Sequence, residues 1–306
     1  DHCVVVSGER IVDVLPSAAA RERYRADTEI RLPSQVLIPG LVNAHTHAAM
    51  SLFRGLADDQ PLNVWLEQHI WPAEARHVDR RFVHDGTLLA AAEMLRSGTT
   101  CFNDMYFFPD EAAAAAIEAG IRAVVGMIVI GFPSAWATNT DEYLENGQRV
   151  HDRYRSHPLI ATAFAPHAPY TVDDAALQRI ATLAEELDVP VHMHVHETRH
   201  EVDDAVARNG VRPLTRLQEF GLASPRLIAV HATTLDDDEI ALLATNGVSV
   251  VHCPESNLKL ASGFCPLARL LDAGVNVALG TDSAASNNDL DMFGEMRTAA
   301  LLAKGV

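Results

Sequence analysis

Cysteine and long apolar runs are both scarce in this sequence, and each shortage excludes a class of protein. The four cysteines form no CxxC pair and are too few for a disulfide scaffold; they are Cys3, Cys101, Cys253 and Cys265. No stretch approaches the roughly 18 consecutive apolar residues of a membrane span, and the first residues lack the charged start and apolar core of a secretory signal. We therefore expect a cytoplasmic protein with reduced thiols.

Basic residues are also in short supply. The 24 lysines and arginines are outnumbered by 41 aspartates and glutamates, which gives a formal net charge of -17. A field of that sign repels polyanions, and the sequence has no basic stripe for a phosphate backbone. The expected partner is a small molecule and not a nucleic acid, and association into a homo-oligomer is compatible with the composition.

The pattern of apolar segments changes near residue 36. Before it, two short apolar runs around Ser7-Gly8-Glu9-Arg10 predict a hairpin, so residues 1–36 are interpreted as a partial β-subdomain. From residue 37 to 306, apolar runs alternate with amphipathic stretches, as in repeated β/α units. The eight runs span 36–47, 99–104, 123–130, 159–164, 189–196, 227–231, 248–252 and 275–282, and the stretches between and after them include 81–96, 111–119, 173–187, 236–245, 266–273 and 289–304.

Two architectures have eight strands that alternate with helices. An open doubly wound sheet is disfavoured, because no GxGxxG follows the first run. Polar residues recur at the C-terminal end of nearly every run, which is typical of a closed (β/α)8 TIM-like barrel. The chain begins without Met and stops at Val306 soon after the last predicted helix, so we expect a fragment of a longer protein.

Two histidines end the first barrel strand. His45 and His47 are two residues apart, so the strand period places both imidazoles on one face. Two neutral imidazoles in that arrangement suit a zinc-like ion. An isolated HxH is more often an ordinary polar pair, and only the matching histidines on later strands favour a metal site here.

The fifth strand carries three histidines in phase, His192, His194 and His196, followed by Glu197. We predict His194 as a metal ligand, since His192 lies deeper in the strand and His196 is expected above the metal plane. Glu197 is the predicted general acid or base, because a carboxylate in a dry barrel mouth has a raised pKa. The alternative for Glu197 is a solvated residue at a helix start.

His231 ends the sixth strand and Asp282 ends the eighth. An aspartate buried there without a cation would be unfavourable, so Asp282 is predicted to complete the metal shell and to accept a proton from bound water. His231 is predicted to hold the resulting hydroxide. The structural alternatives are a helix N-cap for Asp282 and a hydrogen-bonded core residue for His231.

A bound metal ion lowers the pKa of its water from about 16 toward roughly 7, which makes hydrolysis the expected reaction type. Many two-metal relatives of such barrels carry a bridging lysine at the end of the fourth strand, where this sequence reads Ala165-Pro166-His167. One divalent ion is therefore expected, and the imidazole ligands favour zinc.

Taken together, these residues resemble the amidohydrolase superfamily and, within it, the 5-methylthioadenosine/S-adenosylhomocysteine deaminases. The resemblance extends over nearly the whole chain. The motifs that carry it are PGLVNAHTH at 39–47, PHAPY at 166–170, His194 with Glu197, HCPESN at 252–257 and GTD at 280–282.

The resemblance implies hydrolytic deamination of an adenine-type nucleoside: 5'-methylthioadenosine, S-adenosylhomocysteine or adenosine. It implies that Glu197 protonates the purine ring nitrogen, that His231 positions the hydroxide, and that the metal ligands are His45, His47, His194 and Asp282. It further implies that Glu74 holds the ribose hydroxyls and that His167 contacts the substrate. The alternative for Glu74 is a solvated charge in a loop. The alternative for His167 is to support the metal ligands without contacting the substrate.

Two other functions remain open on the sequence. The same metal shell serves other mononuclear members of the superfamily, such as triazine chlorohydrolases and guanine or cytosine deaminases. A metal-binding scaffold without turnover is a different class, and the intact predicted acid, ligands and His231 count against it.

Overall fold

The computed structural model describes residues 2–305, in which two compact units are distinguished, Asp1–Pro39 and Gly40–Val306. In the smaller unit, strand β1 (His2–Ser7) pairs antiparallel with β2 (Arg10–Pro16), and helix α1 (Ser17–Arg23) follows. Gly8 adopts φ +59° in the two-residue turn, a conformation that glycine reaches without strain. The predicted hairpin is present, whereas the short helix α1 was not predicted.

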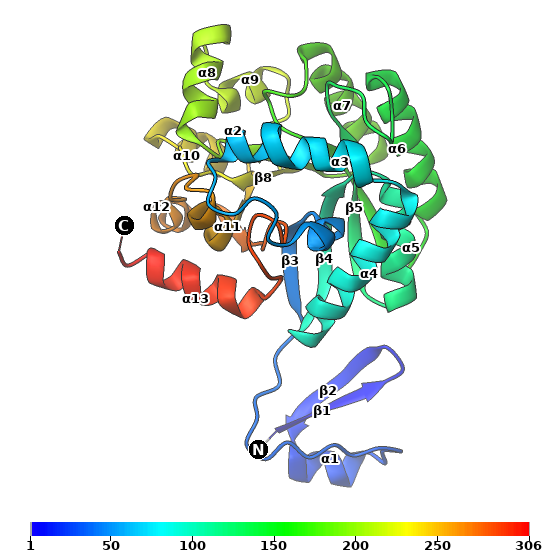
Figure 1. The fold of residues 1–306 in the computed structure, drawn as a ribbon. Coiled ribbons are helices and arrows are strands. Elements are labelled where there is room, and N and C mark those ends of the chain that lie inside the picture. Colours follow the sequence, from blue (N-terminus) through cyan, green and yellow to red (C-terminus); the bar gives the residue numbers. More distant parts are fainter. Residues whose placement is uncertain (1, 306) are drawn as a thin grey trace. The chain divides into compact units, whose positions relative to one another are not determined.

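The larger unit is built on an eight-stranded sheet in which every hydrogen-bonded pair of neighbours is parallel (Figure 1). The order of strands along the sheet follows their order in the sequence. The strands are β3 (Leu41–Thr46), β4 (Thr99–Tyr106), β5 (Arg122–Val129), β6 (Ile160–Pro166), β7 (Val191–Val195), β8 (Leu227–His231), β9 (Ser249–His252) and β10 (Asn276–Leu279).

The first and last strands of this sheet meet, so the sheet closes into a barrel. The backbone N–H of Asp282, just after β10, donates to the carbonyl of His45 on β3 at 3.0 Å. Asn43 of β3 donates to Oγ1 of Thr281 at 2.7 Å and accepts from its backbone N–H at 3.0 Å. The predicted TIM-like barrel is thus confirmed.

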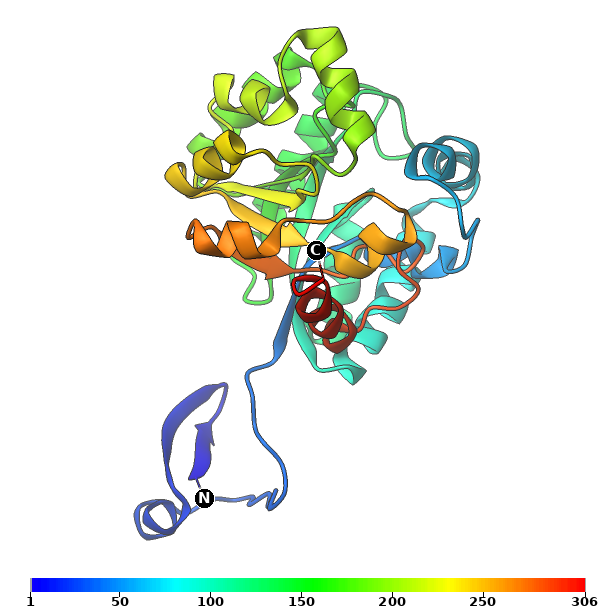
Figure 2. The same ribbon diagram turned by 90° about the vertical axis from the view of Figure 1, so that its left-hand side faces the viewer.

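Helical segments connect the strands and lie outside them in both views (Figures 1 and 2). Most of the longer helices begin at an Asp, Asn or Thr that caps a backbone N–H, as the sequence pattern indicates. The segments are η1 (Ala48–Phe53), α2 (Leu62–Trp65), η2 (Leu66–Ile70), α3 (Trp71–His77), α4 (Arg80–Arg96), α5 (Pro109–Ala119), α6 (Thr140–Tyr154), α7 (Asp174–Leu187), α8 (Arg199–Asn209), α9 (Pro213–Glu219), α10 (Asp237–Thr245), α11 (Pro254–Lys259), α12 (Leu267–Asp272) and α13 (Met292–Leu302).

The structure differs from the predicted elements in two respects. The first barrel strand begins at Leu41, five residues later than the apolar run suggests, because Pro39 has no N–H to donate to a ladder. Helices α6 and α8 were not among the predicted stretches. In α8 only Glu201 and Val202 are buried, whereas α6 has an apolar face that includes Tyr143, Leu144 and Val150.

The larger unit combines an apolar core of strand and helix side chains with a group of buried polar residues at one end of the strands. Large side chains such as Phe102, Met127 and Phe164 are fully buried in the core. Buried polar residues gather at the C-terminal ends of the strands, among them Asp104, His194, His231, His252 and Asp282. In a TIM barrel this end carries the active site.

Within residues 2–305, no helix combines the length and the apolar character that a membrane span requires.

Gly280 permits the close approach of β10 and β3. A Cβ at this position would lie 2.7 Å from the backbone nitrogen of His45. We predict that Gly280→Ala lowers the free energy of unfolding by about 1–3 kcal/mol in urea denaturation, because backbone must shift to admit the methyl group. Gly305→Ala is the control, since its Cβ would meet only contacts of 3.8 Å or more. Equal stability of the two variants would contradict the close approach.

Candidate metal centre and active site

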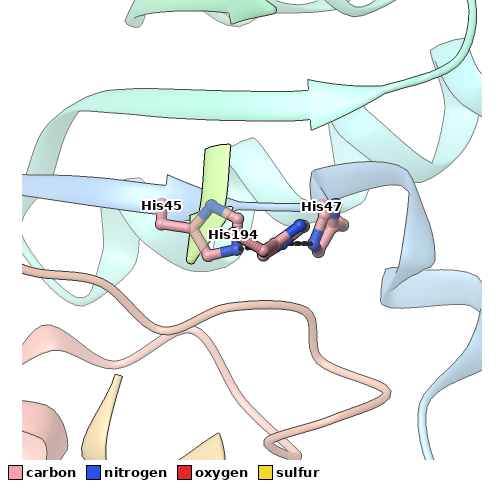
Figure 3. Close-up of side chains that lie close together, drawn as sticks. All are labelled: His45, His47 and His194. Carbon is pink, nitrogen blue, oxygen red and sulfur yellow. Dashed lines mark hydrogen bonds between the residues drawn. The ribbon is translucent and has the colours of Figure 1, made fainter. Parts of the chain in front are cut away.

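Four side chains from three parts of the barrel converge on one point. His45 lies on β3 and His47 follows it, His194 lies on β7, and Asp282 follows β10. Nε2 of His194 is 3.3 Å from Nε2 of both His45 and His47. Oδ1 of Asp282 is 3.2 Å from Nε2 of His45 and 3.3 Å from Nε2 of His47. Figure 3 shows the three imidazoles turned toward one another.

The spacing of these atoms fits a tetrahedral zinc ion. Zinc bonds to imidazole nitrogen and carboxylate oxygen at about 2.0–2.2 Å, so the edges of its tetrahedron measure about 3.3 Å. Four of the six separations among these ligand atoms, those that join His194 and Asp282 to His45 and His47, are 3.2 or 3.3 Å. The donor set therefore suits one zinc ion.

Hydrogen bonds at the atoms that face away from the centre fix the orientation of the converging side chains. Nδ1 of His194 donates to the carbonyl of His167 at 2.7 Å, and Nδ1 of His47 donates to the carbonyl of Met105 at 2.5 Å. Oδ2 of Asp282 accepts from Oγ of Ser256 at 2.6 Å. These contacts leave Nε2 of both imidazoles and Oδ1 of the carboxylate facing the centre.

The electrostatics of the cluster favour a cation at its centre. Burial raises the pKa of Asp282, but the hydrogen bonds and charges of His45 and His47 outweigh it and hold that pKa well below its ordinary value. Burial lowers the pKa of His45 to about 4 and that of His194 well below its ordinary value. Burial also disfavours the charged form of His47, yet Asp282 outweighs it and raises the pKa of His47 to about 9. The buried carboxylate of Asp282 thus favours a positive charge at the centre of the cluster, where a metal ion would bind.

The two other histidines of the fifth strand lie away from the centre. Nε2 of His192 is 2.9 Å from Nδ1 of His45, on the far side of that ring from Asp282. His196 has φ +55°, and its ring bonds to the carbonyl of Thr234 and the N–H of Leu214. Because the backbone turns at His196, side chains no longer alternate between the two faces of the strand there. The His196 ring therefore does not reach the centre.

Glu197 and His231 lie beside the cluster. Nε2 of His231 is 3.6 Å from Oε2 of Glu197, and Oγ of Ser262 donates to Oε1 of Glu197 at 3.2 Å. Burial, reinforced by the negative charge of Asp282, raises the pKa of Glu197. Nδ1 of His231 donates to Oδ1 of Asn257 at 2.9 Å, which fixes the ring with its Nε2 on the side of Glu197.

The backbone is strained where these side chains leave their strands. His196, His231 and Asp282 all have positive φ, at 55°, 72° and 62°. Such conformations are unfavourable for residues other than glycine and cluster at functional sites. The turn before Glu197 is held by buried Glu201, whose two carboxylate oxygens accept the N–H groups of His196 at 3.1 Å and Glu197 at 2.7 Å.

A cavity opens over the cluster, with about 680 Å³ of space not filled by atoms, part of it continuous with solvent. His47, His194, Glu197, His231 and Asp282 line its polar side. Its apolar side includes side chains from the segment α2–η2–α3 and from the barrel: Met50, Leu62, Trp65, Leu66, Ile70, Trp71, Met105, Phe107, Ile128, Ile130 and Leu260. Walls that combine many apolar side chains with a few converging polar groups are typical of sites for heterocyclic small molecules.

Glu74 and His167, both predicted to contact substrate, also line this cavity. Glu74 lies on α3, and burial raises its pKa to about 7. Nδ1 of His167 is 3.0 Å from Oγ1 of Thr171, and burial lowers the pKa of His167 to about 3. The neutral His167 ring packs against His194, with 4.9 Å between ring centroids. Its position agrees with contact to substrate as well as with support of His194.

Sequence reasoning missed several residues of the site. Ser256 and Asn257 belong to the HCPESN segment that the sequence analysis left without a chemical role, and both contact predicted site residues. Ser262 and Glu201 had no signal at all, because their partners are set by the tertiary fold.

Comparison with known proteins places these observations in a family. The model of the amidohydrolase family matches residues 36–306. A 5-methylthioadenosine/S-adenosylhomocysteine deaminase of Saccharophagus degradans is 55% identical over 307 residues, which cover 100% of this chain and 69% of that protein. A 5'-deoxyadenosine deaminase of Methanothermobacter thermautotrophicus is 47% identical over 303 residues, or 98% of this chain and 70% of that protein.

Solved structures give a consistent result. A crystal structure of an adenosine deaminase from Xanthomonas campestris with bound zinc is 60% identical, with a TM-score of 0.98 over 100% of this chain and 70% of that chain. A guanine deaminase of C. acetobutylicum reaches a TM-score of 0.91 at 22% identity over 99% of this chain and 74% of that chain, which is a likeness of fold alone. From the family match and the identity to relatives over its whole length, the chain belongs to the amidohydrolase family and is a metal-dependent hydrolase.

Proposed function

We propose that this protein hydrolyses the exocyclic amino group of an adenine-type nucleoside, giving the inosine analogue and ammonia. The observation that carries the proposal is the position of Glu197, with its raised pKa, beside the converged His45, His47, His194 and Asp282 in a cavity that suits a heterocycle. The relatives of 47–55% identity named above as nucleoside deaminases support the same substrate class.

We propose His45, His47, His194 and Asp282 as the ligands of one divalent ion, zinc. The separations between their ligand atoms support this assignment, and a zinc-bound structure of 60% identity supports the choice of metal. When bound, zinc supplies Lewis acidity that lowers the pKa of a water molecule toward about 7.

The side chains around the centre carry the proton transfers. Asp282 is held as a carboxylate and accepts a proton from the attacking water, whose oxygen bonds to the carbon that bears the amino group. Nε2 of His231 accepts a hydrogen bond from the same water and so orients it. Glu197, whose pKa is raised by burial, donates its proton to the adjacent ring nitrogen. The carbon–nitrogen bond then breaks, and the amino group leaves as ammonia after Asp282 returns to it the proton taken from water. The hydroxyl proton passes to Glu197 as the carbonyl of the product forms, which restores both carboxyl groups.

The remaining walls of the cavity position the nucleoside. Trp65 and Trp71, on the segment α2–η2–α3, provide flat apolar surfaces for the base or for an apolar group on the ribose. Glu74 provides a carboxylate that accepts hydrogen bonds from two ribose hydroxyls, and His167 adds a polar contact next to the base. The apolar walls and the burial of Glu197 also limit the access of bulk water to this proton donor.

We further propose that the protein works in the cytoplasm on a freely diffusing nucleoside and does not bind nucleic acid. Its four cysteines are free thiols, as a reducing compartment allows, and its net charge of -17 repels nucleic acid.

The substrate class is tested by measuring ammonia release and loss of adenine absorbance with zinc-loaded protein. Adenosine, 5'-methylthioadenosine and S-adenosylhomocysteine are the expected substrates, and at least one should turn over far faster than guanine, cytosine or a chlorotriazine. Guanine deaminase and atrazine chlorohydrolase share this fold at only 22–24% identity. Conversion of one of those heterocycles with all three nucleosides left intact would contradict the proposal.

Glu197→Gln tests the assignment of the proton donor. The amide cannot transfer a proton to the ring nitrogen, so we predict a fall in kcat of about 10²–10⁴-fold with zinc content unchanged. Glu186→Gln, at an exposed position on α7, is the matched control and should retain native kcat. Native turnover by the Glu197 variant would rule out the assigned role, and a binding scaffold would be equally unaffected by either change.

Glu74→Gln tests recognition of the ribose. We predict that kcat/KM for adenosine falls by about 10–100-fold, since one charge-assisted hydrogen bond contributes about 1.5–3 kcal/mol, whereas turnover of the free base adenine stays at its native value. Glu67→Gln, an exposed change on the same segment, is the control.

The raised pKa of Glu74 adds a pH signature to this test. Because the pKa of Glu74 is about 7, the carboxylate gains a proton as the pH falls through 7 and loses an acceptor for the ribose hydroxyls. The KM for adenosine should therefore rise below pH 7 in the native protein and should lose this rise in Glu74→Gln. An unchanged pH profile of KM in the variant would assign the titration to another group.

A further inference from the structure

Each of the three proposed histidine ligands has one hydrogen-bond partner at Nδ1. For His47 and His194 that partner is a backbone carbonyl, of Met105 and His167 respectively. His45 differs, because its Nδ1 lies 2.9 Å from Nε2 of another side chain, His192. Both rings are fully buried, and they meet edge to face with 4.9 Å between centroids.

The chemistry of this pair fixes where the protons lie. Nε2 of His45 faces Oδ1 of Asp282 and Nε2 of His194, so its lone pair is the one available to a metal ion. Nδ1 of His45 must then carry the proton, and Nε2 of His192 must accept it. The neutral His192 ring therefore carries its own proton on Nδ1.

That second proton has no acceptor. Nδ1 of His192 is buried without a hydrogen-bond partner among residues 2–305. A buried N–H without a partner is unfavourable, so the stability of the barrel alone does not account for a histidine at this position. An apolar side chain of similar size would fill the same space without that penalty.

From this arrangement, we propose that His192 is a positioning residue of the metal centre. By accepting the proton of Nδ1, it holds His45 in the tautomer and orientation that direct Nε2 toward the ion, and it makes Nε2 a stronger donor. This inference rests on the proposed role of His45 as a ligand. His192 is absent from the lining of the substrate cavity, so its effect falls on metal affinity and not on substrate binding.

Two variants of similar volume separate this role from simple packing. His192→Met removes the acceptor, whereas His192→Gln keeps a carbonyl oxygen near the position of Nε2. With zinc as the probe, in competition with a chelator of known affinity, we expect the dissociation constant to rise about 10–100-fold for His192→Met and to stay close to the native value for His192→Gln. The absorption spectrum of the cobalt(II) form should change only in His192→Met, and KM at saturating zinc should change in neither.

His151→Met is the matched control. His151 is also buried and bonds through Nδ1 to Oγ1 of Thr162 at 2.7 Å, on α6 and away from the proposed ligands. Its replacement should lower the unfolding temperature while leaving the zinc dissociation constant unchanged. If His192→Met does not fold, His192→Asn takes its place, because its shorter side chain cannot bring a carbonyl to the position of Nε2.

The outcomes distinguish this inference from the proposed function. Native zinc affinity in His192→Met or His192→Asn would overturn the role of His192, even if the variant unfolds at a lower temperature. A native chain that takes up no zinc would instead overturn the ligand set on which this inference rests.

Discussion

The structure depends on a buried carboxylate that lies among imidazoles. Asp282 is almost completely buried, and apart from Ser256 the side chains that meet its oxygens are His45 and His47. An ionised carboxylate in such a position is unfavourable unless positive charge lies next to it. The neutral, buried imidazoles of His45 and His194 supply lone pairs but little charge. A divalent cation satisfies both requirements, which is why the ligand set and the charge balance point to the same ion.

Closure of the barrel and assembly of the site are the same structural event. The N–H of Asp282 donates to the carbonyl of His45, and Asn43 joins β3 to Thr281. These bonds join the last strand to the first and bring Oδ1 of Asp282, a proposed ligand, within 3.2 Å of Nε2 of His45, another proposed ligand. Gly280 allows this approach because it has no Cβ. The same junction therefore closes the barrel and sets the spacing of two proposed metal ligands.

Much of the fold and of the candidate site can be predicted from sequence, for identifiable reasons. The strands are short apolar runs that end in polar residues, so their number and their functional ends are visible in the pattern. His45 and His47 are visible as a pair because a strand alternates with a period of two. The same rule makes His196 look equivalent to His194, and it fails there because the strand ends at Val195 and the backbone turns at His196.

What the sequence does not reveal are contacts between distant segments. Glu201 accepts two backbone N–H groups at the turn before Glu197, Ser262 bonds to that carboxylate, and Asn257 orients His231. Each partner is chosen by the closed barrel and leaves no local pattern. The same holds for polar helices such as α8, which are stabilised mainly by caps and by packing of a few residues.

The most direct test of the account is the anomalous diffraction of zinc-loaded crystals, recorded on both sides of the zinc absorption edge. A single zinc centre at this site should give one strong peak per chain, coordinated by Nε2 of His45, His47 and His194 and by Oδ1 of Asp282. A peak that lies elsewhere, or a second ion bridged to the first, would contradict a single metal centre built from these four side chains.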